Sequence, residues 1–126
     1  DALIVCWSKD KIGIDIERAD RQLPAEKLAN RYFCKSEKEQ LKNISDQKKC
    51  SSVLASWVVK EAAIKWQRTK IATNLNQWEW KKSQAIAFHH YSKQKVNIYQ
   101  STYEDWIYAI AYNASIHSNK PIICVY

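Results

Sequence analysis

The stretch KIGIDIE at residues 11–17 decides the fold class, because isoleucines alternate strictly with other residues along it. Strict alternation is typical of a β-strand, whose successive side chains project to opposite faces. The three isoleucines therefore share one face, and Gly13, Asp15 and Glu17 share the other. Gly13 is the only glycine of the chain. Because glycine serves where a backbone needs unusual torsions or close approach, we interpret Gly13 as leaving room for a ligand beside the two carboxylates.

The segments on either side of this strand predict an α+β domain. The apolar run ALIVCW at residues 2–7, followed by a polar turn, predicts an antiparallel hairpin with the strand at 11–17. Residues 51–68 carry an uninterrupted apolar stripe and predict a long helix. We expect one domain, residues 1–126, in which an antiparallel sheet packs against this helix and two shorter ones. The remaining elements are expected as helices at 24–33 and 36–43, strands at 85–89, 95–101 and 106–112, and a last strand or docked tail at 122–126.

The composition limits the class of protein. A chain of 126 residues, 46% of them hydrophobic, can form one core without disulfides. The four cysteines are widely spaced and form neither a C-x-x-C pair nor a Cys/His cluster, so we expect reduced thiols rather than a zinc site. No apolar run reaches the roughly 20 residues that span a membrane, and no signal peptide is recognisable at the N-terminus. We therefore expect a cytoplasmic protein with no membrane partner.

The net charge does not decide which kind of partner the protein binds. A formal charge of +7 suits a polyanion such as nucleic acid, a phosphorylated small molecule or an acidic protein. A generally basic, solvated surface explains the charge equally well.

Asp15 and Glu17 predict a cation site. Residues two apart on a strand project from the same face, with Cα atoms about 7 Å apart. Two neighbouring carboxylates in a core strand repel each other unless a cation lies between them. Oxygen ligands favour Mg²⁺, Mn²⁺ or Ca²⁺ over zinc. Such a pair alone is weak evidence, because exposed strands often carry it by chance.

The long helix strengthens this hypothesis. Trp57, Glu61 and Lys65 lie four residues apart and share one helical face, and Lys60 lies on an adjoining flank. An ordinary surface Glu–Lys pair beside a core tryptophan would give the same spacing. A third carboxylate for the metal, with lysines that meet a phosphate, is the alternative that we favour.

Three motifs in this order resemble a known family. IGIDIE at 12–17, RYFCKSEKEQL at 31–41 and WVVKEAAIK at 57–65 look like the signature of the 4′-phosphopantetheinyl transferases. WIYAIAY at 106–112 resembles a late strand of the same family. Trp57 and Lys65, which open and close the third motif, resemble the surfactin-synthetase-activating type. The resemblance covers most of the chain and implies the phosphopantetheinyl transferase fold.

The resemblance also implies an activity. These enzymes transfer the 4′-phosphopantetheine group of coenzyme A to a serine of an apo carrier protein and release 3′,5′-ADP. By resemblance, Asp15, Glu17 and Glu61 hold Mg²⁺, with Mn²⁺ as a substitute, which also binds the diphosphate of coenzyme A. Glu61 is the candidate general base. Lys65, with Lys60 beside it, is expected to contact the diphosphate, and Trp57 is expected to position this face of the helix.

Partners follow from the same resemblance. Carrier proteins of this kind are acidic helical bundles, so we expect one to dock on the basic segment at 23–33. A solvated basic helix face would explain the same charges equally well. Surfactin-type enzymes have two similar halves, and this chain resembles the second, which predicts either a missing N-terminal half or self-association. The carrier-protein contacts are expected from Lys27, Leu28, Arg31 and Tyr32.

Two other hypotheses stay open. A non-catalytic basic binding module would explain the charge, but the chain has no recognised nucleic-acid motif, so we expect no nucleic-acid partner. A degenerate transferase half, inactive alone, is the other alternative. The intact set of three carboxylates argues against both.

Overall fold

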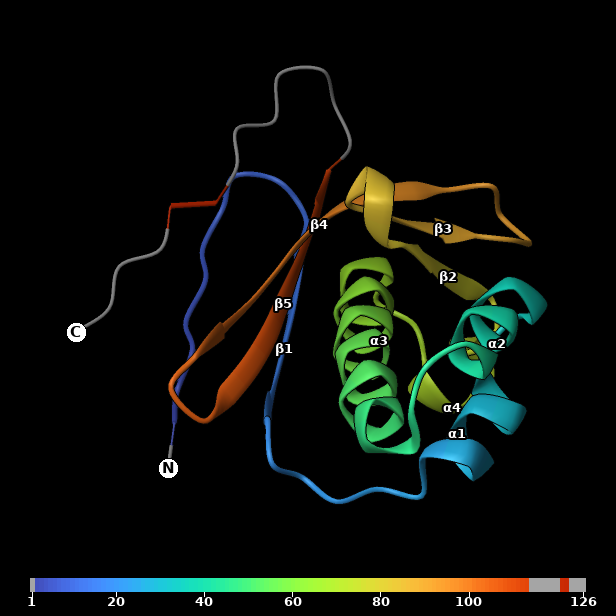
Figure 1. Ribbon diagram of the computed structural model, residues 1–126. Helices are drawn as coiled ribbons and strands as arrows, with labels where there is room; N and C mark the ends of the chain where they lie inside the picture. Colours follow the sequence, from blue (N-terminus) through green and yellow to red (C-terminus); the bar gives the residue numbers. More distant parts are fainter. Residues whose placement is uncertain (1, 114–120, 123–126) are drawn as a thin grey trace.

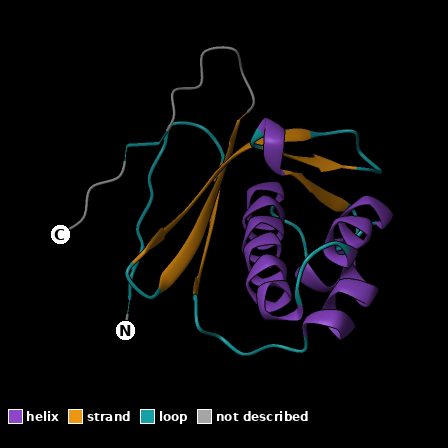
Figure 2. Cartoon of the chain, viewed as in Figure 1, coloured by secondary structure: helices purple, strands orange, loops and turns teal. Residues whose placement is uncertain are grey.

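The computed structural model describes residues 2–113 and 121–122, which form one antiparallel sheet with the α-helices packed on one of its faces (Figures 1 and 2). The sheet has five strands in the order β1-β5-β4-β3-β2. The strands are β1 (Ile12–Arg18), β2 (Trp78–Lys81), β3 (Ile86–His89), β4 (Lys95–Tyr103) and β5 (Trp106–Asn113). The helices are α1 (Ala25–Tyr32), α2 (Lys35–Lys42), α3 (Asp46–Gln67) and α4 (Ile71–Asn74), with a 3₁₀ turn at Lys82–Gln84. The expected α+β fold is confirmed.

Helix α3 crosses the sheet and supplies much of the core. Small side chains allow it to approach β1 and β5 closely, among them the fully buried Ala62, Ala109 and Ala111. Gly13 belongs to the same contact. A methyl group at Gly13 would lie 2.0 Å from the carbonyl oxygen of Ala62 and 2.3 Å from the amide nitrogen of Trp66. Gly13 therefore makes room for helix α3, and our interpretation that it makes room for a ligand is wrong.

The predicted alternation of side chains between the two faces of the strand at residues 11–17 is confirmed. Strand β1 directs Gly13 and Asp15 toward the helix layer, where both are buried. Antiparallel pairing with β5 sets Gly13 opposite Ala111 and Asp15 opposite Ala109. Paired residues share a face of the sheet, so Asp15 projects beside small alanines toward α3.

The predicted N-terminal hairpin is wrong. Residues 2–10 form no strand, and β1 pairs with the C-terminal β5 instead. The side chains of Leu3 and Trp7 are 88% and 87% exposed. Strand β5 is buried over five consecutive residues, so it offers β1 more apolar surface than a short local partner does.

Other boundaries differ less. Helix α3 begins at Asp46 rather than near Ser51. Strand β2 occupies residues 78–81, where no strand was expected. Of the expected tail at 122–126, residues 123–126 lie outside the described part of the chain, and Ile122 is 92% exposed.

The expectations of free thiols and of no membrane-spanning helix can be compared with the structure. Cys6, Cys34 and Cys50 are free, as predicted, whereas Cys124 lies outside the described residues. No helix within the described residues has the length and apolar character needed to cross a membrane.

Candidate active site

Strand β1 and helix α3 bring two of the three predicted carboxylates together. Asp15 projects from β1 and is only 6% exposed, and Glu61 faces it from α3. Lys65 follows Glu61 by one helical turn. Its ammonium Nζ lies 2.6 Å from Oδ1 of Asp15 and 4.0 Å from Oε2 of Glu61. The three groups form one ion cluster between sheet and helix.

Burial and repulsion both act on these carboxylates. Loss of solvent raises the pKa of Glu61 to about 7, and the charge of Asp15 adds to the rise while that of Lys65 opposes it. The pKa of Asp15 is also raised, first by burial and then by the charge of Glu17, against the lowering effect of Lys65. Without a metal ion, a pKa of about 7 leaves Glu61 partly protonated at neutral pH, the range that suits a group which transfers protons.

The cluster fits a hard divalent cation. Oδ2 of Asp15 is buried and has no hydrogen-bond partner among the described residues. A buried, unpaired carboxylate oxygen is costly, and a cation between Asp15 and Glu61 would satisfy it. The ammonium of Lys65 already lies against both side chains, in the place that favours positive charge. Oxygen donors of this kind suit Mg²⁺ or Mn²⁺.

Glu17 is not drawn into the cluster. Its carboxylate accepts a hydrogen bond from the guanidinium of Arg21, at the end of β1 where the side chains become exposed. The oxygens of Asp15, Glu17 and Glu61 do not gather within 4.8 Å of one another as a set of three. Glu17 is close enough to raise the pKa of Asp15, so it contributes negative charge to the site.

Trp57 lies one helical turn before Glu61, close enough for its N–H to lower the pKa of that carboxyl. Indole can only donate, so its N–H favours the ionised carboxylate. The ring is held edge-on against Tyr32 of α1, with centroids 5.6 Å apart. This packing fixes the direction from which Trp57 approaches Glu61.

The prediction that Lys60 contacts a substrate is wrong. Lys60 is fully buried, because helix α3 turns this flank toward the core. Its ammonium lies 2.8 Å from Oε2 of Glu37 and donates to the carbonyl oxygens of Leu75, at 3.2 Å, and of Trp78. An ammonium has three protons, and all three have partners inside the protein.

The sequence did not predict the structural role of Glu37, which joins helix α2 to strand β2 and helix α3. Its carboxylate accepts the backbone N–H of Cys34 and the backbone N–H of Trp80, both at 3.0 Å, besides pairing with Lys60. Cys34 and Glu37 form the capping box of α2, which begins at Lys35, one residue before the expected start at 36. A small polar residue followed three positions later by a glutamate is the sequence pattern of a capping box. Cys34 and Glu37 have this spacing, so the pattern could have predicted the role of Glu37.

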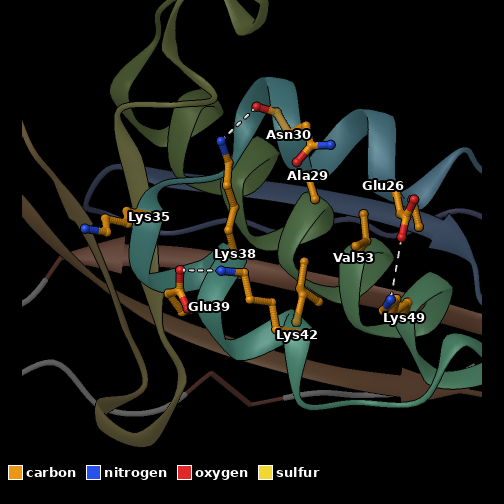
Figure 3. Close-up of a pocket in the computed structure, with 11 residues that line it drawn as sticks. Glu26, Ala29, Asn30, Lys35, Lys38, Glu39, Lys42, Lys49 and Val53 are labelled. Atoms are coloured by element: carbon orange, nitrogen blue, oxygen red, sulfur yellow. Dashed lines mark hydrogen bonds and ion pairs between the residues drawn. The ribbon is translucent and has the colours of Figure 1, made fainter.

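The residues predicted to meet a carrier protein lie on α1. Lys27 and Arg31 are exposed, while Leu28 and Tyr32 are half-buried because they pack against the core. Beside them, a pocket of about 410 Å³ opens between α1, α2 and α3 (Figure 3). Four lysines line it: Lys35, Lys38, Lys42 and Lys49. Two carboxylates also line it, Glu39 paired with Lys42 and Glu26 paired with Lys49, so the pocket carries a net positive charge.

Comparison with known proteins identifies the family. No curated protein matches the chain. Among solved structures, the holo-[acyl-carrier-protein] synthase of Helicobacter pylori, solved in complex with coenzyme A, has the same fold. The TM-score is 0.55 at 22% identity, over 79% of this chain and 96% of that one. Residues 11–111 match the family model of the 4′-phosphopantetheinyl transferase superfamily, and the chain belongs to that superfamily.

Proposed function

We propose that this chain transfers the 4′-phosphopantetheine group of coenzyme A to a serine of an apo carrier protein, in a magnesium-dependent reaction that releases 3′,5′-ADP. The observation that carries the proposal is the cluster of Asp15, Glu61 and Lys65, with its unpaired buried oxygen on Asp15. Two carboxylates and one ammonium, set between a strand and a helix, suit the handling of a diphosphate. Transfer of a phosphoryl group depends mainly on positioning and on charge neutralisation.

The carboxylates have distinct roles in this proposal. Asp15 and Glu61 hold Mg²⁺, and Glu17 adds charge from the end of β1. The ion, when bound, neutralises the diphosphate of coenzyme A. Glu61 accepts the serine proton, directly or through a water. Its pKa is about 7 without a metal ion, because of burial, and would be lower beside Mg²⁺, so the carboxylate is ionised and able to accept a proton at neutral pH.

Lys65 changes partner in this proposal. Its ammonium now neutralises Asp15, at 2.6 Å, and its side chain is 44% exposed. With a metal ion at the carboxylates, Lys65 would no longer be needed to neutralise Asp15 and would be available to the diphosphate. There it stabilises the charge that develops on the departing phosphate. Trp57 holds Glu61 in place for the proton transfer.

The carrier protein docks on α1 and on the lysine-lined pocket beside it. Lys27 and Arg31 present positive charge on the exposed side of α1, and the pocket lysines extend that charge toward α2 (Figure 3). Charge of this kind steers an acidic partner and sets its orientation. Leu28 and Tyr32 supply the apolar edge of the contact.

A second domain, from the same polypeptide or from another copy of the chain, completes the binding of coenzyme A. The exposed apolar side chains of Leu3, Val5 and Trp7 support an association surface on the N-terminal segment. A preceding half, as in the surfactin-synthetase-activating type, and a second copy of the chain are the two candidates. Light scattering of the purified chain distinguishes them, because only self-association gives a mass above that of one chain. The cytoplasmic location stays a prediction.

Transfer can be tested directly by mass spectrometry. The chain is incubated with Mg²⁺, coenzyme A and an apo carrier protein, and we expect the carrier to gain one phosphopantetheine. Glu61→Gln and Asp15→Asn should slow the gain by roughly 10²–10⁴-fold, the usual contribution of acid–base groups. Glu104→Gln, an isosteric change in an exposed turn, is the matched control and should react at the parent rate.

Two outcomes would contradict the proposal. One is the absence of any gain on several carriers, from the chain alone and from a version that carries a preceding half. The other is full transfer by Glu61→Gln. Circular dichroism of each variant shows whether a loss of transfer reflects chemistry or unfolding.

A further inference from the structure

Three side chains with metal-binding atoms meet at a second place, outside the carboxylate cluster. Cys34 is the N-cap of α2, Glu79 lies in β2, and His90 directly follows β3. Their ligand atoms, a thiol sulfur, a carboxylate oxygen and an imidazole nitrogen, all lie within 4.8 Å of one another. It is the one group of this kind among the described His, Cys, Asp and Glu residues.

Tertiary packing, rather than sequence proximity, assembles the three. Strands β2 and β3 pair so that Glu79 stands opposite Phe88. His90, two residues beyond Phe88, stays on the same side of this hairpin. Its ring is held edge-on against Phe88, with centroids 5.3 Å apart. Glu37 then ties β2 to the start of α2 through the amide of Trp80, at 3.0 Å. That tie brings Cys34 over the hairpin.

The spacing of the three donors is close to that of a tetrahedral site. Zinc bonds of about 2.0–2.3 Å place neighbouring ligand atoms roughly 3.3–3.7 Å apart. Nε2 of His90 already lies 2.9 Å from Oε2 of Glu79. The hydroxyl of Ser36 bridges the remaining side, 2.6 Å from Oε1 of Glu79 and 3.1 Å from the sulfur of Cys34. Side-chain movements that shift the ligand atoms by about an ångström would bring them to the spacing of a tetrahedral site.

We propose that Cys34, Glu79 and His90 form a binding site for a divalent metal of the zinc class. The donor set selects the metal. Thiolate and imidazole are the ligands of zinc and cobalt, whereas magnesium and calcium are bound by oxygen. The site is therefore chemically distinct from the carboxylate cluster of Asp15 and Glu61. With three protein ligands, the fourth position is filled by water.

The site is accessible to an ion from solvent. The His90 side chain is 45% exposed, and the Glu79 side chain retains 14%. A bound metal would join the first turn of α2 to the β2–β3 hairpin, across a contact that otherwise depends on hydrogen bonds of Ser36 and Glu37. Its role would thus be to fix α2, and with it one wall of the lysine-lined pocket.

Cobalt(II) titration of the purified chain tests this site. A thiolate-to-cobalt charge-transfer band reports coordination by Cys34, and oxygen ligands alone do not produce it. We expect one equivalent of Co²⁺ to generate the band and one equivalent of Zn²⁺ to remove it by competition. Glu61→Gln should keep the band, because the carboxylate cluster contains no sulfur.

Variants of two of the three ligands make the test specific. His90→Ala changes an exposed side chain, and Cys34→Ser keeps a good helix N-cap, so both should remain folded. Each should weaken Co²⁺ binding by more than about tenfold, the smallest loss typical even of groups that only support metal ligands. Cys50→Ser, a half-buried thiol outside the cluster, is the control and should bind normally. An absent band, or a band that survives His90→Ala with unchanged affinity, would overturn the proposal.

Discussion

The buried pair of Lys60 and Glu37 predicts a large loss of stability when Lys60 is replaced by methionine. Lys60 is 0% exposed and Glu37 5%. Methionine fills much of the same volume but leaves the Glu37 carboxylate and the carbonyls of Leu75 and Trp78 without their donor. Removing one partner of a buried ion pair costs about 3–5 kcal/mol. That is a large share of the roughly 5–15 kcal/mol by which a domain is stable.

Urea unfolding followed by tryptophan fluorescence measures the effect. With a denaturant slope near 2 kcal/mol per molar, typical of small domains, the midpoint should fall by about 1.5–2.5 M. Lys49→Met is the matched control on the same helix. Lys49 pairs with Glu26 and Asp46, which are 78% and 92% exposed, so its loss should cost about 1 kcal/mol or less.

A double variant separates the pair from general damage to the core. Lys60→Met combined with Glu37→Gln removes both charges and keeps an acceptor oxygen at position 37. The double variant should therefore be at least about 1 kcal/mol more stable than the sum of the two single losses implies. The reasoning is refuted if Lys60→Met unfolds within about 1 kcal/mol of the parent while binding of coenzyme A is lost. That result would return Lys60 to the substrate site.

Three further predictions follow from the contacts of β1 with α3. Gly13→Ala should lower the free energy of unfolding by about 1–3 kcal/mol in urea titrations, because its methyl group would meet the backbone of α3; an unchanged midpoint would contradict that contact. The raised pKa of Glu61 means that the folded chain holds a proton which the unfolded chain releases between about pH 4.5 and 7. In metal-free buffer the free energy of unfolding should therefore fall as pH rises through this window, and an equal slope in Glu61→Gln would assign the proton elsewhere. Lys65→Met should reduce phosphopantetheine transfer at least about 100-fold in the mass assay while leaving the fold intact by circular dichroism; equal rates would remove Lys65 from the site.

Side-chain periodicity predicted the main elements of the site. The period of two along 11–17 correctly turned Asp15 and Gly13 to one face of β1. The period of four along α3 correctly placed Glu61 and Lys65 together. Both periods are local properties of the backbone, so they can be read from sequence.

Pairing partners could not be read in the same way. Residues 3–7 alternate between exposed and half-buried side chains but pair with no strand, because β1 pairs with β5, nearly a hundred positions along the chain. Strand β2 escaped notice although Trp78 and Trp80 alternate with Glu79 and Lys81, which is a strand pattern. Its four residues were too few to stand out beside the surrounding polar segments.

The environment of a charged side chain was the least predictable feature. Lys60 and Lys65 are the same residue type on two flanks of one helix. Lys60 is buried because its flank packs against Glu37, Leu75 and Trp78, whereas Lys65 stays partly exposed beside Asp15. The Cys34, Glu79 and His90 cluster has the same origin. Its members come from three elements, and no spacing in the sequence connects them.

The position of β1 in the sheet links metal binding to local opening of the strand. Among the described strands, β1 is an outermost one, hydrogen-bonded to β5 alone. Edge strands open more readily than central ones, and amide hydrogen exchange records each opening. An ion shared by Asp15 and Glu61 would fasten this edge to α3, which lies beneath the whole sheet. The amides of residues 12–18 would then exchange more slowly in proportion to metal occupancy. Hydrogen exchange of this one strand would therefore report the fraction of the protein that has metal bound.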